Sequence, residues 1–393
     1  MPDAVPRHAP GTTRTVANAV LVLREDATPG RLTLEGEGIA AVDPGATGTT
    51  DGAGALDWGG DYALPGLIDL HTDHLERHFV PRPGVHWDPV HAAIAHDAQV
   101  AAAGITTVFD AIALVSGTGD RDRAQMLAPM ADGLRRAQAA GMLRAEHFLH
   151  LRCEVTDPEI FRLIEPFDGD GLVRFMSLMD HTPGQRQFPD LDRVRENYRR
   201  HLGLSDDEVD RYIEEQMARQ RELGPRQRRA LAEIGHARGV PLASHDDQTP
   251  DHVADAKHHG VAVAEFPTTR EAARAARDHG LDVLMGAPNL IRGGSHSGNV
   301  AAAELAREGL LDVLASDYVP GSLIAGAFRL TAEDIGWDLP RAIAAVTATP
   351  AAVAGLEDRG VLEPGRRADL LRVGLVEGVP VVREVWRAGR RVV

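Results

Sequence analysis

In Leu64–His78, "LPGLIDLHTDHLERH", an apolar run ends in ionisable side chains. Burying such side chains without partners costs several kcal/mol, so they belong at a solvated loop or hold a ligand. His71 and Asp73 are two positions apart on the predicted strand, and alternate residues of a strand point to the same side. They can therefore bind one metal ion together.

The composition is that of a soluble globular protein, with 393 residues, 43% hydrophobic and 25% charged. No apolar run is long enough to span a bilayer, and the N-terminus has no hydrophobic segment of the secretory type. One cysteine excludes a disulfide framework, which suits a reducing compartment, so we expect a cytoplasmic protein. The net charge of −16 argues against a nucleic-acid partner but not against an anionic small molecule in a locally positive pocket.

The middle of the chain alternates short apolar strands with amphipathic helices, which is typical of a parallel α/β sheet or barrel. Eight strands over roughly 250 residues predict a (β/α)₈ TIM-type barrel. The predicted strands are Leu67–Asp73, Ile105–Asp110, Glu146–Glu154, Val173–Met179, Val240–His245, Val261–Glu265, Asp282–Gly286 and Asp312–Asp317.

Both ends of the chain have another character, with short strands separated by Gly and Pro turns. We therefore expect an α/β protein in which a barrel over residues 61–355 carries a small β-sandwich domain built from residues 1–60 and 356–393. A charged segment at about 193–236 predicts a helical insertion in the barrel.

Most predicted barrel strands end in a residue of a metal-ligand type, and the carboxyl ends of barrel strands meet on one face. Singly, each has a plainer explanation, such as a hydrogen-bonded histidine or, for Asp317, a helix N-cap. Jointly they predict a metal site, because imidazole and carboxylate ligands suit Zn²⁺, Mn²⁺ or Fe²⁺. The residues are His71, Asp73, Asp110, Glu154, His181, His245, Glu265 and Asp317.

Three motifs resemble those of the amidohydrolase superfamily, and together the resemblance covers nearly the whole chain. "LPGLIDLHTD" is similar to its first barrel strand, "GITTVFD" to its second, and "GVLEPGRRADLL" to its C-terminal return into the β-sandwich. The resemblance implies a metal-dependent hydrolase whose last-strand aspartate, Asp317, accepts the proton of the attacking water. It implies one or two divalent ions held by His71, Asp73, Glu154, His181, His245 and Asp317.

The sequence departs from the superfamily pattern at three points. Asp73 stands where the pattern has a second histidine, and the carboxylated lysine that usually bridges two metals has no candidate. Lys257, the only lysine, falls in a predicted helix, so we expect Glu154 to bridge instead. His181 and His245 come one strand early by the count above; either their placement differs or a strand is miscounted, and we favour a miscount.

Six longer stretches, in chain order, resemble a single branch of the superfamily: "DLHTDHLERHFVPRPGVHW", "HLRCEV", "SLMDHTPGQRQF", "ASHDDQT", "GAPNLIRGGSHSGNVAA" and "LASDYVPGSL". That branch hydrolyses a ribose 5-triphosphate in the carbon–phosphorus lyase pathway of phosphonate use. The resemblance implies cleavage between the α and β phosphorus atoms, giving the 5-phosphate and pyrophosphate. We also expect a homodimer, as for other barrels of this kind.

The triphosphate needs positive or hydrogen-bond-donating groups, and the segment "NLIRGGSHSGN" is the strongest candidate. A helix expected to start near Asn299 would point its positive end toward the phosphates. An ordinary glycine-rich connector is the alternative interpretation. The predicted substrate-binding residues are Arg292, Gly293, Gly294, Ser295 and His296, with Arg82 and Arg186 from other loops.

Two rival functions stay open at this stage. One is a metal-dependent hydrolase of the same fold that cleaves the C–N bond of an N-acyl or cyclic amide. The missing lysine argues against hydantoinases and dihydroorotases, but not against deacetylases with a bridging glutamate. The other is a non-catalytic binding protein, which predicts the loss of ligands, whereas all six candidates are present.

Overall fold

The computed structural model describes residues 13–46, 55–116, 121–295 and 298–393. The chain forms two compact units, the first made of residues 1–108, 133–147 and 313–393, and the second of residues 109–132 and 148–312. No helix within these described ranges is long and apolar enough to cross a membrane.

The predicted barrel is confirmed, with eight strands in the order β13-β12-β11-β10-β9-β8-β7-β6. An isolated parallel bridge between Thr72 and Asp317 connects the two ends of this order. The strands are β6 (Leu67–Thr72), β7 (Ile105–Leu114), β8 (Glu146–Glu154), β9 (Val173–Met179), β10 (Leu242–His245), β11 (Val263–Glu265), β12 (Asp282–Gly286) and β13 (Val313–Ala315).

The strand count was correct, and our preference for a miscount was wrong. His181 follows β9, the fourth barrel strand, and His245 ends β10, the fifth. The two histidines therefore stand one strand earlier than the superfamily pattern because their placement differs.

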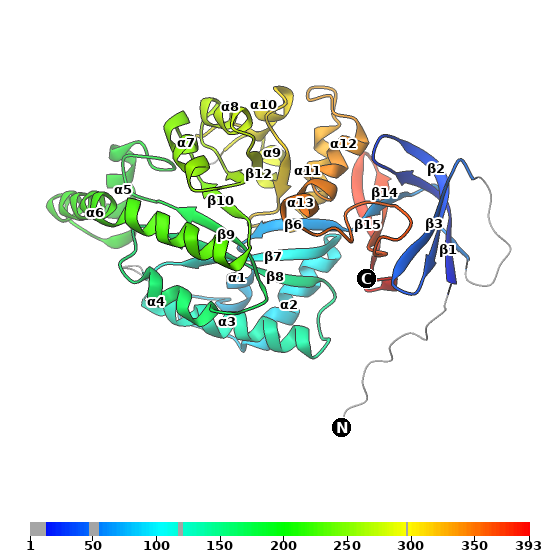
Figure 1. The fold of residues 1–393 in the computed structure, drawn as a ribbon, viewed down its shortest axis with the longest axis horizontal. Coiled ribbons are helices and arrows are strands. Elements are labelled where there is room, and N and C mark those ends of the chain that lie inside the picture. Colours follow the sequence, from blue (N-terminus) through cyan, green and yellow to red (C-terminus); the bar gives the residue numbers. More distant parts are fainter. Residues whose placement is uncertain (1–12, 47–54, 117–120, 296–297) are drawn as a thin grey trace. The chain divides into compact units, whose positions relative to one another are not determined.

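The helices alternate with the strands, and the predicted insertion consists of two helices, α5 and α6, where a capping box of Ser205 and Glu208 begins α6. In Figure 1, α7 and α8 lie beside strands β10 to β12 within the second unit. The helices are α1 (Leu75–Phe79), α2 (Pro89–Ala102), α3 (Arg121–Ala139), α4 (Ile160–Ile164), the 3₁₀ turn η1 (Glu165–Phe167), α5 (Leu191–Leu202), α6 (Asp206–Arg238), α7 (Pro250–His258), α8 (Arg270–Asp278), α9 (Ala287–Arg292), α10 (Ala302–Arg307), α11 (Ser322–Leu330), α12 (Leu339–Ala344) and α13 (Ala348–Val353).

Both chain ends contribute to one sheet in the first unit, where the N-terminal and C-terminal strands lie side by side (Figure 1). Its order is β16-β15-β14-β5-β1-β2-β3, with β4 paired to β1, and its buried core includes Trp58, Leu370 and Trp386. The strands are β1 (Thr13–Val22), β2 (Ala27–Glu35), β3 (Gly38–Pro44), β4 (Ala55–Asp57), β5 (Tyr62–Pro65), β14 (Leu370–Val376), β15 (Val379–Arg387) and β16 (Arg390–Arg391).

The stretch before the first predicted ligand is held by close packing. All six residues of β6 are buried, as expected of a parallel strand covered on both faces. A Cβ atom at Gly66 would lie 2.2 Å from Oγ1 of Thr106, so only glycine fits there. Oδ1 of the buried Asp69 accepts hydrogen bonds from the backbone N–H groups of His71, at 3.3 Å, and Ser316, at 3.0 Å. These bonds fix the positions of His71 and of the residue before Asp317.

Candidate active site

In the first unit the structure brings together the backbones of three predicted ligands, His71, Asp73 and Asp317. The N–H of Asp317 donates to the carbonyl of His71 at 2.9 Å, and the N–H of Asp73 donates to the carbonyl of Asp317 at 3.1 Å. Oγ1 of Thr72 donates to the same carbonyl at 2.9 Å. Asp317 has a φ of 55°, a strained value for a residue other than glycine, of the kind that clusters at functional sites.

The buried carboxyl group of Asp69, which accepts hydrogen bonds from His71 and Ser316, has a raised pKa. Complete burial raises the pKa of Asp69 to about 6, although the hydrogen bonds from Ser316 and His71 act in the opposite direction. Through these two hydrogen bonds the Asp69 carboxyl group connects β6 to the segment after β13.

In the second unit, His181, His245 and Asp246 place potential ligand atoms within 4.8 Å of one another. Oδ2 of Asp246 lies 3.4 Å from Nε2 of His245 and 3.8 Å from Nε2 of His181. This oxygen is buried and makes no hydrogen bond to any described residue. Asp246 is also in the left-handed region, with a φ of 55°. A strained, buried carboxylate facing two imidazole nitrogens fits a divalent metal ion.

Each of the two histidines is held by a glutamate on its other ring nitrogen. Nδ1 of His181 lies 2.8 Å from Oε2 of Glu154, and Nδ1 of His245 lies 2.6 Å from Oε2 of Glu265. Carboxylates paired in this way orient histidine ligands and raise their basicity. Burial alone would lower the pKa of His181, but the hydrogen bond to Glu154 and the charges of Glu154 and Asp246 raise it above the ordinary value.

Sequence reasoning did not name Asp246 as a candidate ligand, and it counted Glu265 among the metal-ligand residue types at strand ends without giving it a role. The signal for Asp246 was present, because it directly follows His245 in the quoted stretch "ASHDDQT". The bridging role predicted for Glu154 stays a prediction; in the structure its carboxylate contacts His181 and accepts a hydrogen bond from Oγ1 of Thr156 at 2.8 Å.

A cavity of about 510 Å³ adjoins Glu154 and His181 within the second unit. The helical insertion forms part of its wall through Tyr198 of α5 and Arg219 of α6. Arg152 of β8 lines it as well, and its Nη2 lies 3.5 Å from Nε2 of His245. In the described part of the chain neither arginine forms an ion pair, although Glu154 and Asp157 line the same cavity.

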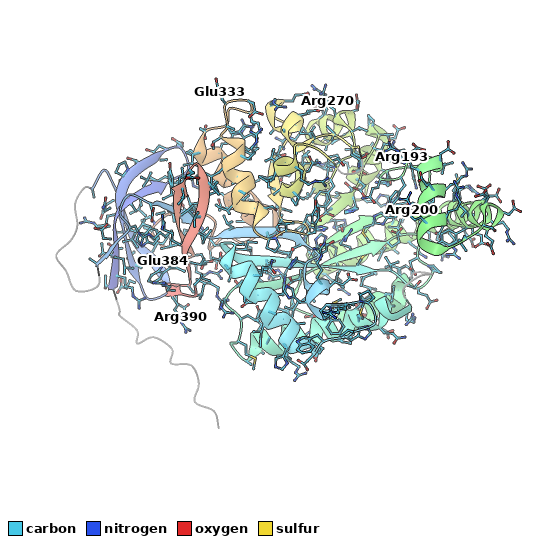
Figure 2. All side chains as sticks on the ribbon, turned by 180° about the vertical axis from the view of Figure 1, so that it is seen from behind. Arg193, Arg200, Arg270, Glu333, Glu384 and Arg390 are labelled. Carbon is cyan, nitrogen blue, oxygen red and sulfur yellow. The ribbon has the colours of Figure 1, made fainter. Side chains whose placement is uncertain are left out.

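The insertion carries other arginines that are placed differently. Arg193 and Arg200 of α5, labelled in Figure 2, keep 75% and 70% of their side-chain surface exposed and pair with Asp190 and Glu196. The sequence alone does not separate these compensated surface charges from Arg219.

The arginine predicted at position 186 to bind phosphate has a different environment. Arg186 is buried, with Nη1 2.6 Å from Oδ1 of Asp247 and 3.0 Å from the carbonyl oxygen of His245. Its charge is therefore compensated inside the protein, and it holds the loop that follows His245. Arg82 lies in the first unit, exposed, in a tight turn bridged to Val85.

The predicted phosphate loop begins at the end of a helix. Arg292 is the last residue of α9 and is exposed, and Gly293, with a φ of 79°, caps the helix; Gly294 and Ser295 follow. His296 lies outside the described residues. The next helix, α10, begins at Ala302 rather than near Asn299, because the side chain of Asn289 holds the preceding turn by accepting from the N–H of Ala302 at 2.9 Å.

A parallel barrel with histidine and carboxylate side chains at the ends of its strands defines the class, a metal-dependent hydrolase. The chain belongs to the amidohydrolase family, whose model matches residues 200–393. It is 44% identical over 379 residues to the α-D-ribose 1-methylphosphonate 5-triphosphate diphosphatase of Escherichia coli K12. The alignment covers 96% of this chain and 99% of that protein.

Solved structures of lower identity share the fold. The 5-methylcytosine deaminase of Klebsiella pneumoniae has a TM-score of 0.63 at 16% identity, covering 96% of this chain and 98% of that one. The N-isopropylammelide isopropylaminohydrolase of Burkholderia multivorans has a TM-score of 0.62 at 17% identity, covering 97% and 98%. At this identity the likeness concerns the architecture alone.

Proposed function

We propose that the chain is a metal-dependent diphosphatase that hydrolyses α-D-ribose 1-methylphosphonate 5-triphosphate to the 5-phosphate and pyrophosphate. The E. coli relative carries this activity in its name and matches 96% of this chain at 44% identity. The observation in the structure that carries the proposal is the cavity beside Glu154 and His181, lined by Arg152 and Arg219, neither of which forms an ion pair with a described residue.

These two arginines indicate the charge of the substrate. The chain has a net charge of −16, and many of its other arginines pair with carboxylates, as Arg228 does with Asp180 and Asp255. Two guanidinium groups without such partners in one cavity favour a substrate that brings its own negative charges, as a triphosphate does. A neutral amide would give neither guanidinium group an anionic partner, so the two arginines argue against the amide alternative.

The predicted ligands His181 and His245, together with Asp246, fit a divalent metal in the second unit, and we propose that His71, Asp73 and Asp317 of the first unit serve the same reaction, with Glu154 as the bridging carboxylate. When bound, one or two ions of the Zn²⁺, Mn²⁺ or Fe²⁺ type would acidify a water and neutralise charge on the phosphate oxygens. Glu154 and Glu265 orient the two histidines through their Nδ1 atoms.

Asp317 is the proposed general base. Its carboxylate takes a proton from the attacking water, while the backbone bonds to His71 and Asp73 hold the residue in its strained conformation. Arg152 and Arg219 donate hydrogen bonds to phosphate oxygens and position the chain of three phosphates.

The segment Arg292–Ser295 and Arg82 stay candidates for further phosphate contacts. For Arg186, the contacts with Asp247 and His245 support a positioning role beside the substrate. We also propose that the enzyme is a cytoplasmic homodimer; light scattering after gel filtration tests the dimer, which a monomer peak would exclude.

The test is the identity of the phosphate product released by metal-loaded enzyme. We expect pyrophosphate in a one-to-one ratio with the 5-phosphate, and none from a matched Asp317→Asn variant. Turnover of N-acyl amino acids or cyclic amides, without release of pyrophosphate from the triphosphate, would replace this proposal with the amide alternative.

A further inference from the structure

Three histidine rings form a cluster in the first unit that the proposed mechanism does not use. His74 is the N-cap of α1, His78 lies one turn later on the same helix, and His96 lies on α2. Their ring centroids are 5.0 Å (His74–His78), 5.8 Å (His74–His96) and 5.7 Å (His78–His96) apart. Each ring offers a nitrogen within 4.8 Å of one on the other two, which is a spacing that one metal ion can span.

The hydrogen bonding of two of the rings, His74 and His78, is incomplete. His74 is only 8% exposed, and its Nδ1 is buried without a hydrogen-bond partner among the described residues. The Nε2 atom of the half-buried His78 is also buried without such a partner. A polar nitrogen buried in this way is destabilising unless something satisfies it, and two such nitrogens from neighbouring rings point to one shared ligand.

The geometry favours a cation over an anion. The three ring centroids lie within 5.8 Å of one another, so three protonated, positively charged rings would repel one another. A neutral imidazole nitrogen is the form that coordinates a metal. A phosphate or sulfate would need protonated rings.

The side chains next to His96 are held by hydrogen bonds. The ring of His96 lies 5.6 Å from that of His147, whose Nε2 is 3.3 Å from Oδ1 of Asp97. The same carboxylate accepts hydrogen bonds at 2.8 Å from the backbone N–H groups of Arg144 and Ala145. The side chains around His96 are thus held in place before any ligand arrives, as expected of a built site.

We propose that His74, His78 and His96 bind one divalent transition-metal ion, of the zinc class, separate from the ions of the proposed catalytic centre. Three imidazole nitrogens suit Zn²⁺, and a water can fill the fourth position. The ion would connect α1, the first helix after β6, to α2. It would thereby stabilise the segment that directly follows the predicted ligands His71 and Asp73.

The first test is anomalous diffraction at the zinc edge from crystals of the full-length wild-type protein grown with Zn²⁺. We expect an anomalous peak between the three rings. A peak confined to the surroundings of His181 and His245 would overturn the proposal, and this measurement needs no variant.

The second test counts metal in the purified protein by mass spectrometry. His78→Gln and His96→Gln are expected to hold one ion per chain fewer than the wild type, whereas His91→Gln, an exposed histidine on α2, keeps the full number. An unchanged number in His78→Gln and His96→Gln would contradict the proposal. His245→Gln removes a different ion, so the two sites fail separately, and failure of this proposal leaves the diphosphatase proposal standing.

Discussion

Arg219 offers a sharp test of how the cavity recognises its substrate. It lines the cavity from α6, is half-buried, and forms no ion pair with the residues that the structure describes. Replacing it with glutamine removes the charge but leaves no carboxylate without its partner. We therefore expect the free energy of unfolding of Arg219→Gln to change by no more than about 0.5 kcal/mol.

The effect on the reaction should be much larger. A hydrogen bond to a charged group contributes about 1.5–3 kcal/mol, and each 1.4 kcal/mol corresponds to a factor of ten. Loss of one contact between guanidinium and phosphate predicts a fall in kcat/KM of about 10- to 150-fold. If the contact forms equally in the bound substrate and the transition state, the whole loss appears in KM.

The assay is steady-state release of pyrophosphate at fixed ionic strength, with Arg221→Gln as the matched control. Arg221 is an exposed residue two positions along the same helix. Arg219→Lys should recover part of the loss, because it restores the charge without the planar pair of donors. Equal kcat/KM values for Arg219→Gln and Arg221→Gln would refute the assignment of this cavity to the triphosphate.

Three further predictions concern the base, the ion network and the packing of the first unit. Asp317→Asn should lower kcat by about 10²- to 10⁴-fold with metal content nearly intact; loss of the metal as well would make Asp317 mainly a ligand. Arg359 and Arg367 hold the pKa of the half-buried Glu146 below its ordinary value, against the effect of burial. This stabilisation is present above the unfolded pKa and is lost as the pH falls through the folded one. Glu146→Gln should therefore destabilise the protein by about 1.5–3 kcal/mol at pH 7 and flatten its acid denaturation below about pH 4.5; an unchanged urea midpoint at pH 7 would contradict this. Gly66→Ala should cost about 1–3 kcal/mol by overpacking, whereas Gly171→Ala, where a Cβ would meet no atom within 4 Å, should not; equal melting temperatures would count against the close packing of β6.

The strands and their order could be predicted from the sequence because each is a short apolar run between turn residues. All eight predicted barrel strands are present, and β8, β9 and β12 have the predicted bounds. The error concerned the resemblance rather than the strands, since the superfamily pattern led us to doubt a count that was correct. Hydrophobic periodicity is local information, and it was sufficient here.

The sequence could not predict in the same way which arginines are paired with carboxylates and which line the cavity without an ion pair. The sequence contains many arginines, and it does not show that Arg186 is paired with Asp247 while Arg152 and Arg219 have no such partner. Asp246 was missed for a related reason. Its role depends on a left-handed backbone conformation after β10 that turns the carboxylate toward two histidines, and no residue pattern in "SHDD" specifies that turn.

The most direct test of the central claim is phosphorus NMR of α-D-ribose 1-methylphosphonate 5-triphosphate incubated with the zinc- or manganese-loaded enzyme. We predict that the three triphosphate resonances are replaced by those of pyrophosphate and of a 5-monophosphate, with the methylphosphonate signal retained. Stepwise release of single phosphates, or an unchanged spectrum from enzyme with its metal bound, would contradict the account.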